Sequence, residues 1–499
     1  MASLAPQPVQ DLATPQAVTP PAPILHRGKF RFPPGLKLNL PFYSFSKFFD
    51  PRNPILLFEY LAKFGRAAHY RLLWHHIVLL TDPADIREVL VDKAHLFIKE
   101  RTQKRMRILL GEGLITADGE THKRHRRIAA PAFHRQRIQA YASTIVEYAA
   151  AQRDQWQPGR QIDVAAEMMR LALQITARTL FDTAVTPEIH AINDESNAVM
   201  DMYNSLVSLP RAEDLLRWHI PVPVLIRFRR SKKHLDQVVD QMIAAKQAEI
   251  AQALREGRPI GGDLLSMLIA ARDENRDSPS SSKDSAAVRL SSKELRDEVL
   301  TIFLAGYETV ANALSWTWLL LGQNPHAEAR LHAELDSVLL DQSGNPRLPT
   351  LEDLPQLPYT EMVIAEAMRL YPPAWAMGRQ ATEDVEIGPY RLPKNSFVFF
   401  SQYIVHRDPR FFPDPEAFRP ERFTPEAKAS RPKFAYFPFG GGGRQCIGES
   451  FAWMEAILTL ATLAQRWRLT LVENQTIALQ PKITLRPKFG IQVTPEPRL

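Results

Sequence analysis

Long stretches of this chain alternate apolar and polar residues with the period of an α-helix. Apolar side chains recur every three to four positions in residues 171–180, 234–253 and 295–321, and this spacing predicts amphipathic helices. Runs that are compatible with strands are short and few, and residues 76–80 and 397–400 are the clearest examples. The pattern therefore predicts a mainly α fold with small β-sheets.

The third predicted helix has a defined start and an unusual interior. Ser291 and Glu294 have the spacing of a capping box, whereas Gly306 and Thr309 interrupt the helix centre. A mid-helix glycine lowers helix stability by roughly 1 kcal/mol relative to alanine. A compensating role is therefore expected for these residues. Either Gly306 permits close helix packing and Thr309 bonds to the carbonyl four residues earlier, or the helix opens here for a ligand.

The composition suits one large folded unit with a short extension. Hydrophobic residues make up 45% of the chain, which can build a core, and no internal repeat is evident. Residues 1–35 are rich in proline and alanine, a composition that cannot pack a core, and we expect them to be disordered. Residues 36–499 then form a single large domain, with a surface loop over residues 277–292.

The N-terminus lacks the charged start and apolar stretch of a signal peptide. The chain also has no run of 18 apolar residues that would span a bilayer. We therefore expect a soluble, cytoplasmic protein of bacterial type. Clustered aromatic residues in 42–49, and mixed apolar and basic residues in 225–233, would permit at most peripheral contact with a membrane.

The net charge of +7 and the pI near 9.3 raise the question of nucleic-acid binding. Basic residues are dispersed, acidic residues are nearly as numerous, and no nucleic-acid motif is present. Binding to nucleic acid is therefore excluded as a function class.

The single cysteine, Cys446, lies in a glycine-rich segment from Phe439 to Gly448. A lone cysteine cannot form an intrachain disulfide, and free cysteines are often small buried hydrophobes in flexible turns. Here, glycines allow backbone N–H groups to approach the sulfur, and Arg444 adds positive charge, so both favour a thiolate. Phosphate binding is excluded, because Glu449 stands where a P-loop needs its lysine. Cys446 is thus a candidate ligand or nucleophile.

Phe439, Gly442, Arg444, Cys446 and Gly448 resemble the haem-binding loop of the cytochrome P-450 family, position for position. The resemblance spans residues 36–493 and implies the cytochrome P-450 fold. It implies that Cys446 is the thiolate ligand of the iron in haem b (iron protoporphyrin IX). Phe439 would pack near the sulfur, Gly442 and Gly448 would shape the loop around the haem, and Arg444 would reach a haem propionate.

The interior of the long helix resembles the oxygen-binding groove of the same family. Ala305 and Gly306 would lie against the haem. Glu308 and Thr309 would be the catalytic acid and alcohol that relay protons to dioxygen. The peroxide-using or isomerising members of the family commonly lose this pair, so the pair favours a monooxygenase over that alternative.

Two further groups of charged residues resemble family motifs. Glu366 and Arg369 share one face of a predicted helix over residues 359–370, a spacing that by itself is typical of an ordinary surface salt bridge. With Arg422 they would form the buried cluster that supports the cysteine segment.

The second group consists of candidate contacts to the haem carboxylates, namely His122, Arg126 and Arg379. His122 departs from the tryptophan of many family members but can still donate an N–H group. The neighbouring Lys123, Arg124 and Arg127 are interpreted as a solvated face. His406 has no second metal ligand at suitable spacing, which predicts a structural histidine.

The resemblance implies a haem-thiolate monooxygenase that hydroxylates an apolar organic substrate. Because the chain ends about fifty residues after Cys446, it leaves no room for a fused reductase. Electrons would come from NAD(P)H through a separate reductase and an acidic ferredoxin or flavodoxin, attracted by basic residues at 123–127, Arg135 and Arg137. We expect a monomer. A haem carrier or gas sensor is the alternative outside the enzymes.

Residues around the substrate are also implied by the resemblance, with residues 97–114 as a lid. The implied pocket residues are largely apolar: Leu304, Ala374, Trp375, Ala376, Met377, Ile483 and Thr484. Fatty acids, terpenoids and similar lipid-like molecules all fit such a pocket, and fatty acids are favoured by analogy alone.

Overall fold

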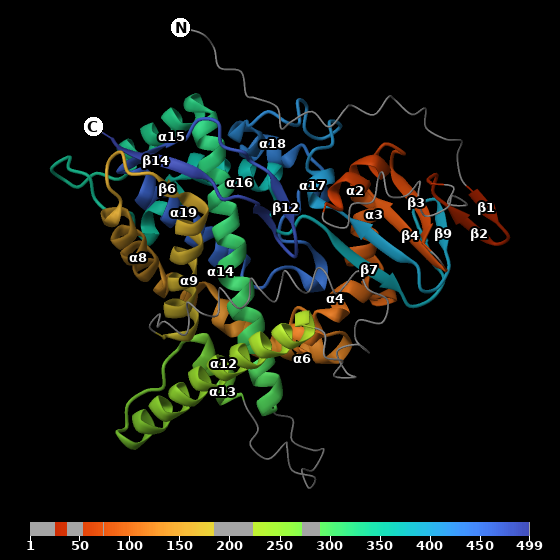
Figure 1. Cartoon of the computed structure of the whole chain (residues 1–499), viewed down its shortest axis with the longest axis horizontal. Coiled ribbons are helices and arrows are strands. Elements are labelled where there is room, and N and C mark those ends of the chain that lie inside the picture. The colour runs from red at the N-terminus through yellow and green to blue at the C-terminus, as the bar shows by residue number, and fades with distance from the viewer. Residues whose placement is uncertain (1–24, 37–52, 73, 184–222, 272–289, 499) are drawn as a thin grey trace.

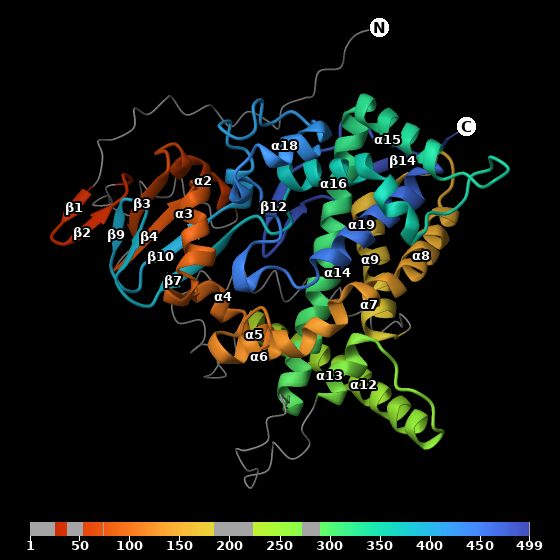
Figure 2. The same cartoon turned by 180° about the vertical axis from the view of Figure 1, so that it is seen from behind.

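The computed structural model describes residues 25–36, 53–72, 74–183, 223–271 and 290–498 (Figures 1 and 2). The predictions for residues 1–24, for the aromatic cluster at 42–49 and for nearly all of the loop at 277–292 lie outside these residues.

The longest central element is the helix α14, Ser292–Gln323, which runs through the middle of the molecule in Figure 1. Ser291 and Glu294 form the predicted capping box at its start. It packs on α9 (Val164–Phe181), α16 (Pro358–Leu370) and α19 (Glu449–Ala464). The helices predicted from the apolar period are confirmed as α9, α14 and the longer α12 (Pro223–Arg255).

Further helices surround these five. Their bounds are α2 Ile55–Ala62, α3 Pro83–Arg87, α4 Arg101–Arg105, α5 Arg107–Leu110, α6 Gly119–Ala129, α7 Arg135–Ala140, α8 Ala142–Gln155, α13 Leu264–Ala270, α15 Pro325–Val338, α17 Gln402–Val405 and α18 Pro425–Ala429. The predicted lid over residues 97–114 is formed by the strand β5 (Phe97–Lys99), α4 and α5.

Two sheets lie together at one side of the helices (Figure 1). The five-stranded sheet has the order β3-β4-β10-β7-β5 and contains both predicted strands, in β4 and β10, which pair in parallel. The four-stranded sheet has the order β1-β2-β9-β8. The bounds are β1 Leu25–Arg27, β2 Phe30–Phe32, β3 Ala67–Leu72, β4 His75–Leu80, β7 Met377–Ala381, β8 Val385–Ile387, β9 Tyr390–Leu392 and β10 Phe397–Phe400.

Two further small sheets close the fold. They are the three-stranded sheet β11-β14-β6 and the hairpin β12-β13. Their bounds are β6 Ile162–Asp163, β11 Trp467–Leu471, β12 Leu479–Pro481, β13 Leu485–Pro487 and β14 Gln492–Pro497. The prediction of a mainly α fold with small sheets is confirmed.

The start of the packed structure differs from the sequence prediction. Residues 25–32 form the antiparallel pair β1 and β2, so disorder through residue 35 is wrong for this part. The physical reason is Phe32, which is 2% exposed and stacks on the rings of His69 and His76 at 4.6 and 4.5 Å. This aromatic anchor, together with the pairing of β2 with β9, attaches the strands to the sheet.

The main hydrophobic core lies between the long helices and includes Trp316, Trp318 and Trp467, all fully buried. None of the helices in the described ranges combines the length and the apolar character needed to cross a bilayer.

Candidate active site

A cavity of about 350 Å³ lies where the cysteine segment, α14, α6 and β7 meet. We call the segment from Phe437 to Gly448 the cysteine loop. Cys446, Phe439, Gly448 and Arg444 of this loop contribute to the cavity wall. The loop connects to α19, which begins at Glu449.

The cysteine loop needs glycine at defined places. Gly442 has φ +69°, and a Cβ atom there would lie 2.0 Å from the carbonyl oxygen of Leu90. Gly448 has only ordinary contact at 3.6 Å, with Phe133. The N–H group of Cys446 donates to the carbonyl of Phe439 at 3.0 Å, and the Phe439 ring lies 5.8 Å from Trp453. The tight backbone therefore holds Cys446 in one place.

The side chain of Cys446 is exposed toward the cavity, although protein atoms pack densely around it. Burial raises the pKa of this thiol to about 11, and the opposing hydrogen bond from the Gly448 backbone is too weak to reverse this. The Gly448 hydrogen bond and the charge of Arg126 favour the thiolate, but without a bound cation burial outweighs them. A bound metal cation would remove the proton, so the site suits a metal ligand better than a free nucleophile.

Five basic side chains form one wall of the cavity, and we call them the cationic wall. They come from β5, α6, β7 and the cysteine loop, and they are Lys99, His122, Arg126, Arg379 and Arg444. The structure thus brings together the four residues predicted from the sequence and adds Lys99. Sequence reasoning missed Lys99, because Lys99 begins the charged run Lys99-Glu100-Arg101 and looks like a surface residue, whereas in the structure it is 6% exposed.

The groups of the cationic wall bond mainly to backbone carbonyls. Arg444 donates to Ala117 at 3.0 Å and to the Asp118 carboxylate at 2.5 Å. Arg126 donates to the carbonyl of Gln445 at 2.7 Å. Lys99 donates to the carbonyls of Leu114 and Ile115.

Crowding and burial disfavour the charged forms of these groups. Burial and then the charge of Arg444 lower the pKa of Lys99 to about 6 and that of His122 to about 3. The same two causes lower the pKa of Arg379 to about 10. Carboxylates of a bound ligand would relieve this repulsion. The cationic wall and Cys446 together fit a group that carries both a metal and carboxylates, as haem does.

On the α14 side, Ala305, Gly306 and Thr309 face the cavity. A Cβ atom at Gly306 would lie 3.0 Å from Cγ2 of Thr176, and the Thr309 hydroxyl donates to the Ala305 carbonyl at 3.0 Å. Both structural explanations from the sequence are therefore present. Gly306 and Thr309 nevertheless also lie on the cavity wall, where a bound ligand could contact them.

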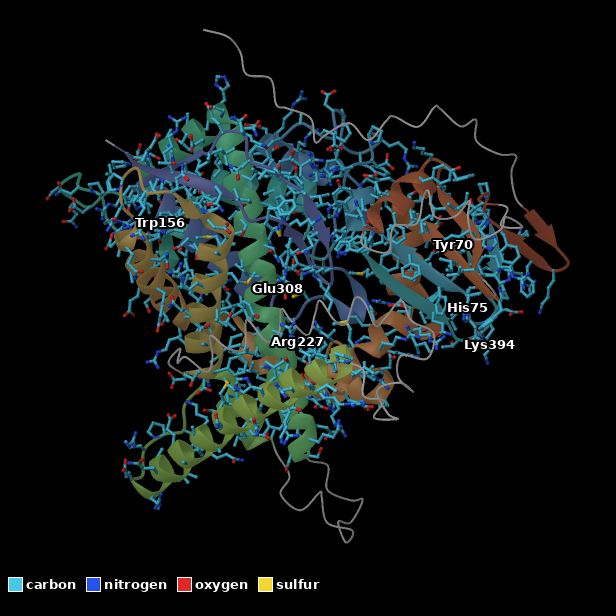
Figure 3. The ribbon with its side chains drawn as sticks, viewed as in Figure 1. Tyr70, His75, Trp156, Arg227, Glu308 and Lys394 are labelled. Carbon is cyan, nitrogen blue, oxygen red and sulfur yellow. The ribbon has the colours of Figure 1, made fainter. Side chains whose placement is uncertain are left out.

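Glu308, the predicted acid partner of Thr309, is bonded to residues far from it in the chain. Its carboxylate forms an ion pair with Arg486 at 2.7 Å and accepts a hydrogen bond from the Thr484 hydroxyl. Glu308 is 5% exposed, and it is not among the described residues of the cavity wall. Figure 3 labels it on α14. Because the hairpin β12-β13 holds this side chain, Glu308 lies outside the described cavity wall, and its role as the acid partner of Thr309 stays a prediction.

The predicted substrate pocket agrees with the structure only in part. Of the predicted residues, Ala374 and Met377 belong to the described cavity wall, and the others do not: Leu304, Trp375, Ala376, Ile483 and Thr484. Trp375 and Ala376 instead pack in the cluster around Phe58, and the Trp375 indole donates to the Lys482 carbonyl at 2.8 Å. Leu304 lies in the helical core, Ile483 packs against that core, and Thr484 binds Glu308.

An apolar wall that the sequence did not indicate replaces these residues. Its members come from the end of the predicted lid and the residue after it, from α9, α14 and α16, and from the segment after α16. They are Leu114, Ile115, Leu180, Ile302, Val310, Ala313, Ile364, Met368 and Pro373. They were missed because most of them have the local pattern of ordinary core residues, and Ile115 that of a single exposed apolar residue. These side chains face one cavity only because the folded chain packs these elements against one another.

The predicted charged cluster is assembled as expected. Arg369 donates two hydrogen bonds to the Glu366 carboxylate, at 2.6 and 2.8 Å, and both side chains are fully buried. Arg422 lies 3.3 Å from the same carboxylate. Such a buried pair tolerates its desolvation because each oxygen is hydrogen-bonded.

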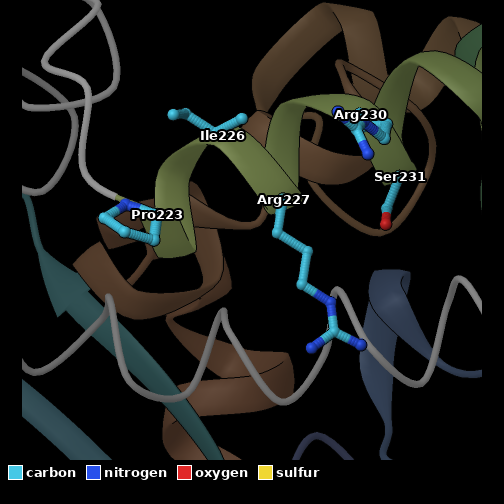
Figure 4. Close-up of a pocket in the computed structure, with 5 residues that line it drawn as sticks. All are labelled: Pro223, Ile226, Arg227, Arg230 and Ser231. Atoms are coloured by element: carbon cyan, nitrogen blue, oxygen red, sulfur yellow. The ribbon is translucent and has the colours of Figure 1, made fainter.

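Two further features lie at the surface, outside this cavity. Lys123 and Arg127 are exposed as interpreted, but Arg124 bonds to Glu294 and is only partly exposed. A pocket at the start of α12 is lined by Pro223, Ile226, Arg227, Arg230 and Ser231 (Figure 4). It is open and brings together no acid, base or nucleophile pair, so the cavity beside Cys446 remains the candidate active site.

The chain is similar to known proteins over most of its length. The family model described as cytochrome P450 matches residues 33–495. Cyclooctatin synthase of Streptomyces melanosporofaciens is 37% identical over 90% of this chain and 92% of its own length. Cyclooctat-9-en-7-ol 5-monooxygenase of the same organism is 34% identical over 85% and 87%. Pentalenene oxygenase of Streptomyces avermitilis is 33% identical over 87% and 89%.

These matches confirm the resemblance inferred from the motifs around Cys446. Since the family match and the relatives both extend over most of the chain, this protein belongs to the cytochrome P450 family and is a haem-dependent monooxygenase that receives electrons from a redox partner.

Proposed function

We propose that this protein hydroxylates an apolar, polycyclic terpenoid. Similar proteins are named for oxidations of cyclooctat-9-en-7-ol and pentalenene, and this similarity replaces the preference for fatty acids. One observation carries the proposal: Cys446, the cationic wall and the apolar wall share a single cavity. A compact hydrocarbon suits such a wall because burial of its apolar surface supplies the binding energy.

Cys446 would hold the iron of haem b through its sulfur, and the cationic wall would hold the haem carboxylates. Haem supplies the iron at which dioxygen is activated, and its thiolate ligand favours cleavage of the O–O bond. Arg444 belongs to the cysteine loop and Arg379 to β7, so the two donors to the haem carboxylates would come from separate elements. Their separate origins would fix the orientation of the bound group.

Thr309 would deliver protons into the cavity from its Oγ1 atom, since this hydroxyl lies on the α14 wall beside Gly306. The hydroxyl now donates to the Ala305 carbonyl at 3.0 Å, which orients it. Glu308 would return a proton to the Thr309 hydroxyl. It could do so only after its Oε1 atom is released from Arg486 and Thr484. The part of Glu308 in the relay is therefore conditional on movement of the hairpin β12-β13.

Electrons would come from NAD(P)H through an acidic ferredoxin or flavodoxin that binds a basic surface of the monomer. Arg127, Arg135 and Arg137 are exposed on and after α6 and support this surface. Arg135→Glu should slow reduction at low salt, and the difference from the unchanged protein should shrink as salt screens the charges. Lys394→Glu is the matched control, because Lys394 is exposed at the distant sheet (Figure 3).

The central experiment measures haem content and the spectrum of the reduced carbon monoxide complex. We expect a thiolate-type spectrum that Cys446→Ser abolishes. A panel of terpenoids and fatty acids is then titrated while the haem spectrum is followed, and turnover is tested with a reductase system. Tighter binding and oxidation of fatty acids would refute the substrate class, and binding without any turnover would favour a haem carrier or sensor.

Thr309→Ala tests the proton step separately. We expect electron consumption to continue while product falls, because the hydroxyl that delivers protons is gone. Unchanged coupling of electrons to product would contradict the role of Thr309.

A further inference from the structure

His406 is a buried histidine outside the cavity that has so far been assigned no function. It follows α17 directly and is 0% exposed. Its ring lies edge-on to Phe437, with centroids 5.3 Å apart, and tilted to Tyr436 at 4.9 Å. Phe437 is the first residue of the cysteine loop, so this ring contacts the loop where the chain enters it.

The imidazole also makes a directed hydrogen bond to the loop. The Nε2 atom of His406 accepts the backbone N–H of Phe437 at 2.9 Å. An acceptor nitrogen carries no proton, so the ring is neutral with its proton on Nδ1. Burial and then the charge of Arg369 hold the pKa of His406 well below 6.5, which keeps this acceptor available.

The backbone of His406 is fixed from the opposite side by the buried charged cluster. Arg369 donates to the carbonyl of His406 at 3.0 Å and to that of Pro415 at 2.7 Å. The guanidinium is itself held by two hydrogen bonds to Glu366. His406 is therefore attached at its carbonyl to the cluster and at its ring to the cysteine loop.

Backbone hydrogen bonds continue from this point to the cysteine. The carbonyl of Phe437 accepts the N–H of Gly440 at 2.9 Å, and the carbonyl of Phe439 accepts the N–H of Cys446 at 3.0 Å. A shift of the Phe437 backbone would therefore disturb both of the turns that place the sulfur.

We propose that His406 is a positioning residue for Cys446, which connects the Glu366 and Arg369 pair to the cysteine loop through its Nε2 atom. The inference rests on the proposed role of Cys446 as the iron ligand. A competing explanation is that the ring only fills space between Tyr436 and Phe437. The two explanations differ in whether an acceptor atom is needed.

Three variants of the haem-loaded protein separate these explanations. His406→Gln keeps an acceptor oxygen at similar reach, His406→Met fills the space without a good acceptor, and Phe400→Leu is the packing control. Phe400 is fully buried, and its ring lies 6.3 Å from that of Phe437 without a hydrogen bond to the loop. The measurement is the rate at which the reduced carbon monoxide complex changes from the thiolate to the thiol type.

We expect His406→Met to accelerate this change by about tenfold to a hundredfold, because the buried N–H of Phe437 loses its acceptor. His406→Gln and Phe400→Leu should stay within about threefold of the unchanged protein. Equal rates for His406→Met and the unchanged protein, or an acceleration by Phe400→Leu as large as that by His406→Met, would overturn the proposal. Absence of a thiolate-type complex in the unchanged protein would instead refute the proposed function.

Amide hydrogen exchange in the unchanged haem-loaded protein gives a second test that needs no variant. Phe437 lies in a turn, yet its N–H should exchange as slowly as the buried centre of α16, because it is bonded to His406. Exchange of this amide at the rate of exposed loops would contradict the proposal even if His406→Met does not fold.

Discussion

His125 offers a prediction of how stability depends on pH. This residue lies on α6 between the two cavity residues His122 and Arg126, and its side chain is fully buried. Its Nδ1 atom is 2.5 Å from the Glu298 carboxylate on α14, and its Nε2 atom is 3.6 Å from Glu294. A charged imidazole here joins α6 to α14.

The magnitude follows from the pKa of His125. Burial alone would lower this pKa, but the hydrogen bonds to Glu294 and Glu298 outweigh burial and raise it from 6.5 to about 9. This difference corresponds to about 3 kcal/mol. Because the folded pKa lies above the unfolded one, the stabilisation is complete below pH 6.5 and is lost as the pH rises through 9.

The perturbation is His125→Gln, which can hydrogen-bond to carboxylates but carries no charge. Urea unfolding should show the variant to be less stable by about 3 kcal/mol at about pH 6, and the gap should shrink toward about pH 10. Lys123→Gln is the control, since Lys123 pairs with Glu120 on the exposed face of the same helix. A gap between His125→Gln and the unchanged protein that is the same at both pH values would refute the reasoning.

Three further predictions concern the site. Arg486→Met leaves the buried carboxylate of Glu308 without its ion pair and should lower the free energy of unfolding by about 3 kcal/mol; an unchanged urea midpoint would contradict this pairing. Lys99→Met should speed the transfer of haem to an excess of another haem acceptor about tenfold, because one carboxylate loses a partner, and a transfer rate equal to that of the unchanged protein would exclude Lys99 from haem binding. Gly442→Ala should abolish the thiolate-type carbon monoxide complex, because φ is +69° and the Leu90 oxygen would lie 2.0 Å from the new Cβ. Gly448→Ala is the control and should retain the complex, because its new Cβ would have its nearest contact at 3.6 Å.

The sequence by itself determined the positions of the long helices and the family. The apolar period located α9, α12 and α14, and Ser291 and Glu294 marked the start of α14. The spacing around Cys446 was sufficient to infer the family. Each of these features depends on residues that are near one another in the chain, so the physical constraints on them can be read from spacing alone.

The tertiary structure decided which side chains meet. Glu308 is paired by Arg486, 178 residues later in the chain, and Trp375 is drawn away from the cavity by packing near Phe58 and by its bond to Lys482. A carboxylate or an indole has the same local pattern whichever partner it finds, because its environment comes from elements far apart in the sequence. For the same reason the sequence by itself identified Cys446 as the candidate metal ligand, whereas only the folded chain showed that Lys99 completes the cationic wall and that the His406 ring contacts the cysteine loop.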